Sequence, residues 1–377
     1  MRLVPTLCLP FVALCLATGC GLLGSDDDDG TTQGPRGPLT TPDTPDDSGS
    51  SPLDTSTTPS PIDSDTGFVV VGPTAATGST AATADTGTTT LPVVDCAALP
   101  RPPIATRSVP GARGYHGLVF TDDGRLVGSD GSALVAADIK GNTSVLLPGT
   151  GSLQQLDKLS DGTLIAASSS DGALLAIDPM TGGSTIIASG LSGGLYGARV
   201  APDDTIFLAD QDRILRVDPA TGANTVWLEQ NNVTPKVLDF NVDFTKMYVG
   251  TNYTSGKVWE VLLDASFDPI GPAVELARTP GSWHDGLTVD ICGNIYVAEY
   301  NNRALYRITP DGNVGTIIDL SGGQNDQYGH GAVFGPGANG WLMDAIYVPQ
   351  PYNGDTVAEI IVGVPHRSYT GPVVNAP

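Results

Sequence analysis

The sequence predicts an all-β protein, a six-bladed β-propeller preceded by a signal peptide and a disordered linker. Three observations indicate this fold. From Tyr115 onward, a cycle of short apolar stretches and turns returns about every 40 residues, as in the four-stranded blades of a propeller. One type of turn recurs in several cycles, and no convincing 3.6-residue periodicity follows the leader. The alternative fold is a two-sheet sandwich.

The chain begins with a segment that has the features of a secretory signal. Arg2 precedes an apolar run over residues 3–16 that is too short to span a membrane, and small residues then lead to Cys20. Small residues directly before a cysteine resemble the bacterial lipobox, whose cysteine is lipidated. We therefore expect residues 1–20 to be a lipoprotein signal peptide and Cys20 to carry the lipid. The alternative is an ordinary cleaved signal with an incidental cysteine.

The lipid would attach the protein to a membrane of the bacterial cell envelope. Gly21, which follows the cysteine, favours the outer membrane by the same resemblance. The sequence leaves open whether the domain faces the periplasm or the cell surface.

Residues 21–92 are expected to form a disordered tether. They hold 11 Asp, one Arg, no Lys and one aromatic residue, and most of the rest is Ser, Thr, Pro and Gly. Such a segment buries too little to offset its ordering entropy. As a flexible coil it would span about 40–50 Å, enough to lift a domain clear of a membrane surface.

The charge of the chain excludes one class of partner. The formal net charge is −23 over 377 residues, and residues 93–377 alone carry 30 acidic and 16 basic residues, a net charge of −14. Binding to phosphate backbones depends on Lys and Arg, so we expect no nucleic-acid partner. Residues 93–377 are expected to form one propeller that acts as a monomer.

The turn between the third and fourth strands is the clearest marker of the repeat. It occupies residues 177–182, 217–222 and 308–312, where Pro presets φ and Gly permits positive φ, as a hairpin requires. Blades 4 and 6 are lengthened by residues 263–272 and 335–340. The first strands of the six blades are expected near Leu118, Leu156, Ala198, Leu238, Leu287 and Ala332.

Two features concern the closure of the ring. Residues 104–109 are expected to join blade 6 as an outer strand, beside residues 357–364 and the C-terminal segment around 366–369. Cys96 and Cys292 are the only cysteines that remain in the folded region, and in an oxidising compartment they are expected to pair. Such a disulfide would fasten the entry strand near the seam of blades 5 and 6. The alternative is two unpaired thiols.

One segment resembles a known family. Trp283-His284-Asp285-Gly286-Leu287-Thr288-Val289-Asp290, continuing through residues 293–299, resembles the SMP-30/gluconolactonase/LRE-like family of six-bladed propellers. The resemblance implies a divalent metal at the mouth of the central channel and lactone hydrolysis. Asp285 matches one of the family's ligands, but His116, Tyr196 and Lys236 stand where the family has other residues. The family's own metal site is therefore not expected to be intact.

The departures from the family pattern form another candidate site. The residues that head the first strands are His116, Gln155, Tyr196, Lys236, Asp285 and His330. Blades 5, 6 and 1 are neighbours in a closed ring, so Asp285, His330 and His116 should converge, with His284 as a candidate fourth ligand. Two imidazoles and a carboxylate suit zinc, iron or manganese better than calcium. The alternative is that these side chains hydrogen-bond neighbouring strand ends and close the channel polar and dry.

Two classes of function remain open. The first is a metal-dependent hydrolase of a small lactone or ester, in which Lys236 or Tyr196 stabilises developing negative charge. Tyr115, Trp283 and Tyr328 would wall its small-molecule pocket, or else pack between blades. The second is a noncatalytic propeller that binds a protein, glycan or envelope ligand. The fold itself does not decide between them.

Overall fold

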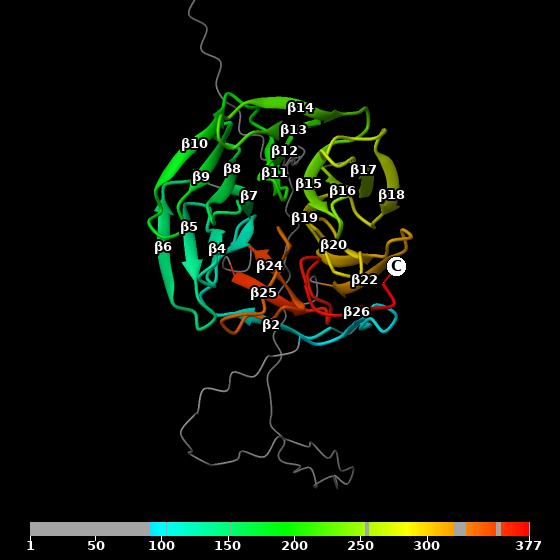
Figure 1. The fold of residues 1–377 in the computed structure, drawn as a ribbon. Helices are drawn as coiled ribbons and strands as arrows, with labels where there is room; N and C mark the ends of the chain where they lie inside the picture. Colours follow the sequence, from blue (N-terminus) through cyan, green and yellow to red (C-terminus); the bar gives the residue numbers. More distant parts are fainter. Residues whose placement is uncertain are drawn as a thin grey trace, which may run out of the picture. The chain divides into compact units, whose positions relative to one another are not determined.

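The strands of the computed structural model form six four-stranded sheets around one axis, and a separate two-stranded pair (Figure 1). The predicted six-bladed β-propeller is thereby confirmed. Among the described residues, no helix is long and apolar enough to cross a lipid bilayer. The predicted signal peptide, Cys20, residues 21–90 of the predicted tether, and Tyr328 lie outside the described residues. The structure describes residues 91–102, 104–151, 153–252, 256–319, 329–351 and 356–376.

The first three blades follow one another along the chain. Blade 1 consists of β3 (Leu118–Phe120), β4 (Leu126–Ser129), β5 (Ala133–Ala137) and β6 (Thr143–Pro148). Blade 2 consists of β7 (Leu153–Lys158), β8 (Leu164–Ser168), β9 (Ala173–Ile177) and β10 (Ser184–Ser189). Blade 3 consists of β11 (Leu195–Val200), β12 (Ile206–Asp210), β13 (Arg213–Val217) and β14 (Asn224–Glu229).

The last three blades complete the ring. Blade 4 consists of β15 (Pro235–Phe240), β16 (Lys246–Thr251), β17 (Lys257–Leu262) and β18 (Val274–Arg278). Blade 5 consists of β19 (His284–Val289), β20 (Ile295–Glu299), β21 (Ala304–Ile308) and β22 (Val314–Asp319). Blade 6 consists of β23 (Val333–Phe334), β24 (Ala345–Gln350), β25 (Thr356–Ile361) and β2 (Thr106–Val109).

Burial changes from the axis to the rim of each blade. The innermost strands β15 and β19 are buried along their whole length, whereas the first three residues of the outermost strands β6 and β14 are exposed. Neighbouring blades cover both faces of the strands near the axis. For this reason a second strand such as β12 is buried at every residue and reads as an almost continuous apolar run.

The repeated turn of the sequence is one repeated hydrogen-bonded hairpin. Between β9 and β10, the Asp178 carboxylate accepts the N–H groups of Met180 and Thr181, and Gly182 has a φ of 73°. The turn that begins at Asp218 between β13 and β14 has the same bonds. The two predicted insertions lie between β17 and β18 and between β23 and β24.

The N-terminal strand β2 closes the ring, as predicted. It pairs antiparallel with β25, from Thr106 opposite Ile360 to Val109 opposite Val357. Arg107 of β2 donates two hydrogen bonds, of 2.6 and 3.0 Å, to the buried Glu359 of β25. The last blade is therefore completed by the beginning of the folded chain, and β24 of blade 6 contacts β3 of blade 1.

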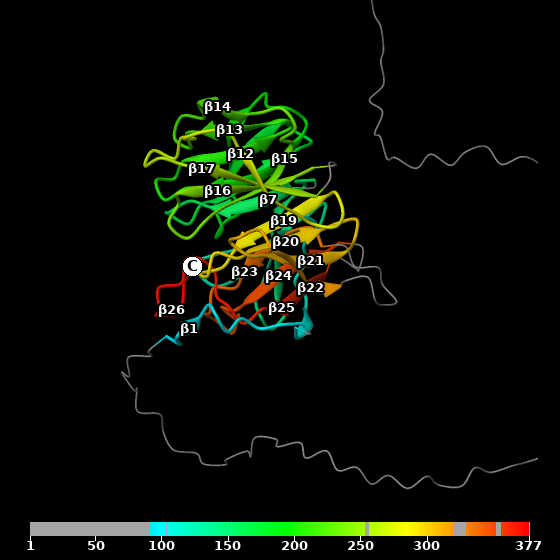
Figure 2. The same cartoon turned by 90° about the vertical axis from the view of Figure 1, so that its right-hand side faces the viewer.

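The C-terminal segment does not join blade 6, which corrects the expectation for residues 366–369. The outer edge of β25 is already occupied by β2, so no ladder position remains there. The segment crosses to blade 5 instead, where Ile291 donates to the Pro365 carbonyl and Arg367 donates to the Val289 carbonyl, both at 3.0 Å. It ends in β26 (Val373–Val374), which pairs in parallel with β1 (Val94–Asp95) (Figure 2).

A disulfide fastens this region. It joins Cys96, directly after β1, to Cys292 in the turn between β19 and β20, and the two Cα atoms lie 5.5 Å apart. The Asp290 carboxylate shapes that turn by accepting the N–H groups of Cys292 and Asn294 at 2.9 and 2.8 Å. The bond spans 196 residues of sequence and ties the entry of the propeller to blade 5.

Replacing both Cys96 and Cys292 with Ser should lower the free energy of unfolding by about 2–5 kcal/mol, because the cross-link restricts a long loop of the unfolded chain. Denaturant unfolding with and without a reductant measures this. The reductant should destabilise the wild type and leave the double variant unchanged. Equal unfolding midpoints for wild type and variant under oxidising conditions would contradict the prediction.

Candidate functional site

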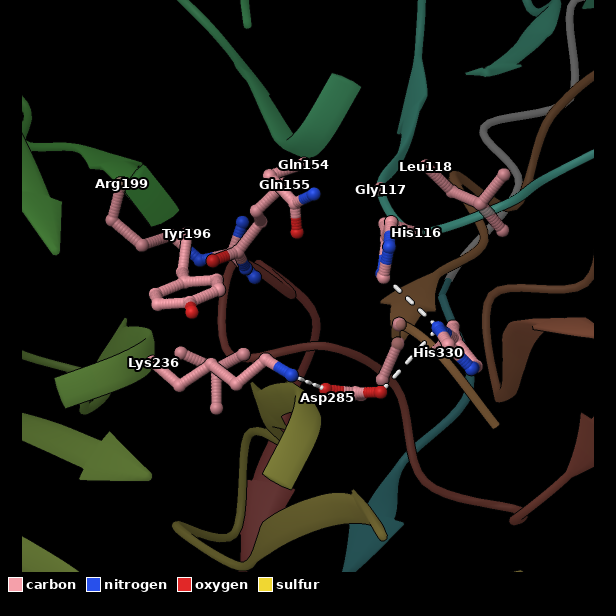
Figure 3. Close-up of a pocket in the computed structure, with 13 residues that line it drawn as sticks. His116, Gly117, Leu118, Gln154, Gln155, Tyr196, Arg199, Lys236, Asp285 and His330 are labelled. Carbon is pink, nitrogen blue, oxygen red and sulfur yellow. Dashed lines mark hydrogen bonds and ion pairs between the residues drawn. The ribbon is translucent and has the colours of Figure 1, made fainter. Parts of the chain in front are cut away.

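The candidate site is a cavity lined by residues at the starts of the innermost strands, a place that we call the mouth (Figure 3). The cavity has a volume of about 20 Å³, which is room for one water molecule or one metal ion. Six blades contribute to its wall. The lining residues are His116, Gly117, Leu118, Gln154, Gln155, Tyr196, Arg199, Lys236, Val237, Asp285, His330, Gly331 and Ala332.

β-Bulges bring polar side chains to this mouth. The pairing register shifts in β7, β11, β15 and β19, each time at the start of the innermost strand. The shifted segments contain Gln155, Tyr196, Lys236 and Asp285 respectively. A bulged residue is left out of the ladder and its side chain is re-aimed. The same irregularity in four blades therefore presents a ring of polar groups to the channel.

Glycines beside these residues let neighbouring blades touch backbone to backbone. A Cβ on Gly331 would lie 2.3 Å from the carbonyl oxygen of His116, a distance that real side chains do not reach. Gly117, Gly197 and Gly286 approach the next blade in the same way, with Cβ distances of 2.3, 2.5 and 2.3 Å. The glycines thus draw the strand heads together, and with them the side chains that precede each glycine.

His116, His330 and Asp285 converge at the mouth, as the order of the blades predicts. The Nδ1 atoms of the two histidines lie 3.0 Å apart, and the His330 Nδ1 lies 3.4 Å from an Asp285 oxygen. One candidate ligand atom from each residue lies within 4.8 Å of the other two. His330 and Asp285 are buried, whereas His116 is half-buried.

Both imidazoles of this cluster are held neutral. Burial lowers the pKa of His330 to about 4, with nearby Lys236 acting in the same direction and Asp285 opposing it. Burial, His330 and Lys236 together lower the pKa of His116 well below its ordinary value. A neutral imidazole offers a nitrogen lone pair, which is the state that binds a metal.

Lys236 and Tyr196 also face this site. The Lys236 ammonium forms an ion pair with Asp285 and lies 4.3 Å from the ring centre of Trp283 and 5.3 Å from that of Tyr196. Lys236 as a whole is 4% exposed. Burial lowers the pKa of Lys236, and Asp285 opposes that shift.

His284 does not join the cluster, which corrects its assignment as a candidate fourth ligand. It neighbours Asp285 on β19, and successive strand residues point to opposite faces. Its Nδ1 accepts the Thr251 N–H at 3.2 Å, and its Nε2 lies 2.8 Å from the Thr279 hydroxyl. Both ring nitrogens are therefore engaged between blades 4 and 5, and burial lowers the pKa of His284 to about 3.

The predicted aromatic residues lie beside the histidines. The Tyr115 ring stands edge-on to His116, with 4.7 Å between ring centres, and Trp283 lies 4.9 Å from Tyr300. Tyr300, just after β20, packs edge-on against His330 at 4.9 Å and was not predicted. No motif marks Tyr300, because its position depends on the length of a turn.

A second layer of charge below the mouth was also missed. Arg199 of β11 donates to the Leu287 carbonyl at 3.1 Å and lies 3.8 Å from Asp157 and 3.5 Å from Asp239. Arg367 of the C-terminal segment reaches the same Asp239 at 3.3 Å. A sequence signal existed, because a charged residue stands within the innermost strand of each of blades 2, 3 and 4.

The family model described as SMP-30/Gluconolactonase/LRE-like region matches residues 117–325 of the chain, more than half of its length. No curated protein matches the sequence.

Several solved structures share the fold. A gluconolactonase from Xanthomonas campestris aligns with a TM-score of 0.58 and 15% identity over 69% of this chain and 89% of that one. The calcium-binding protein regucalcin from Agrobacterium tumefaciens aligns with a TM-score of 0.56 and 18% identity over 74% and 98%. An auxiliary nutrient binding protein from Bacteroides thetaiotaomicron aligns with a TM-score of 0.56 and 12% identity over 68% and 70%. At these identities the similarity establishes the fold alone.

Gly331→Ala should lower the free energy of unfolding by about 1–3 kcal/mol, because its methyl group would force blades 6 and 1 apart. Denaturant unfolding measures the change. Gly315→Ala is the matched control, since a Cβ there meets its nearest backbone atom at 4.0 Å. A Gly331→Ala variant as stable as the Gly315→Ala variant would show that the close approach is not a constraint.

Proposed function

The chain belongs to the SMP-30/gluconolactonase/LRE-like family, and we propose that it hydrolyses a small lactone or ester with a divalent metal at its channel mouth. The observation that carries this proposal is the convergence of His116, His330 and Asp285 from three neighbouring blades. Membership of the family supplies the class of substrate, and the donor set supplies the class of metal.

The residues present fit a transition metal. Three protein ligands with an open position are the arrangement of catalytic zinc sites. Imidazole nitrogen is a good ligand for zinc and iron, whereas calcium takes six to eight oxygen ligands, which this set does not offer. Zinc, iron or manganese is therefore the better candidate, and the cavity has room for one ion.

A divalent metal bound there would polarise a lactone or ester carbonyl and activate water. The chain's own residues would bind and orient the substrate around it. Tyr196 and Lys236 line the cavity and supply O–H and N–H donors for the negative charge that develops on the carbonyl oxygen. Tyr115 and Trp283 would form the apolar walls beside them.

A second candidate function is binding without catalysis. The observation that favours it is the Lys236–Asp285 ion pair, which engages the one carboxylate of the donor set. A propeller of the same fold is described as an auxiliary nutrient binding protein. In this alternative the polar mouth would hold a small envelope ligand, a glycan or a protein loop without turnover.

Elemental analysis and hydrolysis assays should separate the two functions. The purified protein should contain close to one transition metal per chain and should open small lactones or cleave small esters. Chelation should abolish the activity and zinc or manganese should restore it. Asp285→Asn and His330→Ala should each reduce metal affinity and turnover by about 10- to 100-fold or more.

Asp268→Asn is the matched control, because it removes a carboxylate from an exposed ion pair with Arg216 and should change neither quantity. Turnover that survives complete metal removal would contradict metal dependence. Metal or ligand binding without any turnover would favour the noncatalytic alternative.

We also propose that the propeller is held at the bacterial envelope by a lipid on Cys20, which the pattern of residues 1–20 supports. A Cys20→Ser variant expressed in a bacterium should lose labelling by a radioactive fatty acid and leave the membrane fraction. Cys8→Ser removes a cysteine of the leader and should be labelled normally. Equal labelling of the Cys20→Ser variant and the wild type would contradict the proposal.

A further inference from the structure

Lys236 occupies an unusual position in the candidate site. A β-bulge between Pro235 and Val237 lifts it out of the β15 ladder, and its side chain is 5% exposed. Its ammonium lies against Asp285, the single carboxylate among the three converging ligands (Figure 3). A buried ammonium is costly unless it is paired, and among the described ion pairs Asp285 is the carboxylate that pairs with Lys236.

The ion pairs along the channel leave Lys236 as the ammonium partner of the Asp285 carboxylate. The buried Asp239 is shared by Arg199 and Arg367, at 3.5 and 3.3 Å, and the half-buried Asp157 lies 3.8 Å from Arg199. Among the described ion pairs, Asp285 has two partners: the Lys236 ammonium at one oxygen, and the His330 Nδ1, 3.4 Å from the other.

A divalent metal that binds Asp285 competes with the Lys236 ammonium for the negative charge of that carboxylate. Lys236 pairs with one carboxylate oxygen, and the other lies 3.4 Å from His330. The cavity holds only about 20 Å³, so an incoming cation would lie close to the ammonium in a buried site, where repulsion between like charges is weakly screened.

The structure also provides a second place for the ammonium. The Lys236 Nζ already lies 4.3 Å from the ring centre of Trp283 and 5.3 Å from that of Tyr196. Aromatic faces attract cations at such distances, most strongly when the site is desolvated. These two rings are therefore the partners that remain beside the ammonium when the contact with Asp285 is discounted.

We propose that Lys236 is the resident counter-ion of Asp285, and that a divalent metal must displace it toward Trp283 and Tyr196 in order to bind. This inference rests on the metal site of the proposed function. It also links the metal to the proposed donor, because the ammonium released from Asp285 becomes available to substrate. Metal binding would then also make the Lys236 ammonium available as a donor.

Metal titration of the full-length protein tests the proposal. Lys236→Met removes the charge and keeps much of the side-chain volume, so zinc and manganese should bind at least about 10-fold more tightly than to the wild type. Lys246→Met is the matched control, because it deletes the ammonium of a half-exposed pair with Glu260 on blade 4 and should leave metal affinity unchanged. Lys236→Gln is the second variant. It also removes the charge but keeps an N–H donor for Asp285, so it should still bind metal more tightly if the Lys236→Met variant fails to fold.

Tryptophan fluorescence tests whether the Lys236 side chain moves when metal binds. A lysine with only a structural role would stay in place and leave the emission unchanged. Moving the ammonium against Trp283 should alter the emission of the wild type during metal titration. The change should disappear in Trp283→Phe and shrink in Lys236→Met.

The outcomes separate this inference from the proposed function. Equal or weaker metal binding by both Lys236 variants would overturn displacement, while the metal site itself would stand. Tighter binding by these variants without turnover by the wild type would support displacement and overturn the hydrolase. Binding of metal to neither wild type nor variants would overturn both.

Discussion

The arrangement of the channel mouth depends on one constraint, the backbone contact of neighbouring blades at four glycines. Gly117, Gly197, Gly286 and Gly331 each bring an innermost strand so close to the next blade that no side chain fits between them. The residue before each glycine lies at the start of the same innermost strand. The backbone contacts that close the ring therefore also bring four side chains close together, those of His116, Tyr196, Asp285 and His330. Tight packing and the polar site therefore have a common origin, and a change to one alters the other.

Charge balance is the second determinant of the channel. Three acids pair with three bases along the channel, so this buried to half-buried set carries no net formal charge of its own; the residues are Asp157, Asp239, Asp285, Arg199, Arg367 and Lys236. Burial disfavours each group singly, which is why these groups occur as pairs. The mouth differs from the deeper layer because its cation is a lysine, whose flexible side chain can move between Asp285 and two aromatic rings. The arginines below are held by several partners and lack that freedom.

The repeated features of the fold can be predicted from the sequence. Features that depend on the length or path of one particular turn or segment cannot. The repeat period and the recurring hairpins predict the six blades and their first strands. The order of the blades in a closed ring predicts the convergence of His116, Asp285 and His330, and the need to complete the last blade predicts the closure by β2. His284 was misassigned because adjacent residues share a sequence motif while pointing to opposite faces of β19. Tyr300 and the path of residues 366–369 were missed for a related reason, since turn lengths and already occupied strand edges leave no periodic signal.

The far end of the channel explains why the mouth is the place for a ligand. The innermost strands β15 and β19 carry Lys236 and Asp285 as their second residues, at the mouth, and end at Phe240 and Val289. There the Arg367 N–H donates to the Val289 carbonyl at 3.0 Å, and its guanidinium lies 4.5 Å from the Phe244 ring centre and 3.3 Å from Asp239. The C-terminal segment thus packs at this end, and the disulfide of Cys96 and the pairing of β1 with β26 hold the N-terminal strand beside it. The first described residues of the folded chain, with β1 and Cys96, therefore lie at the end of the propeller opposite His116 and His330.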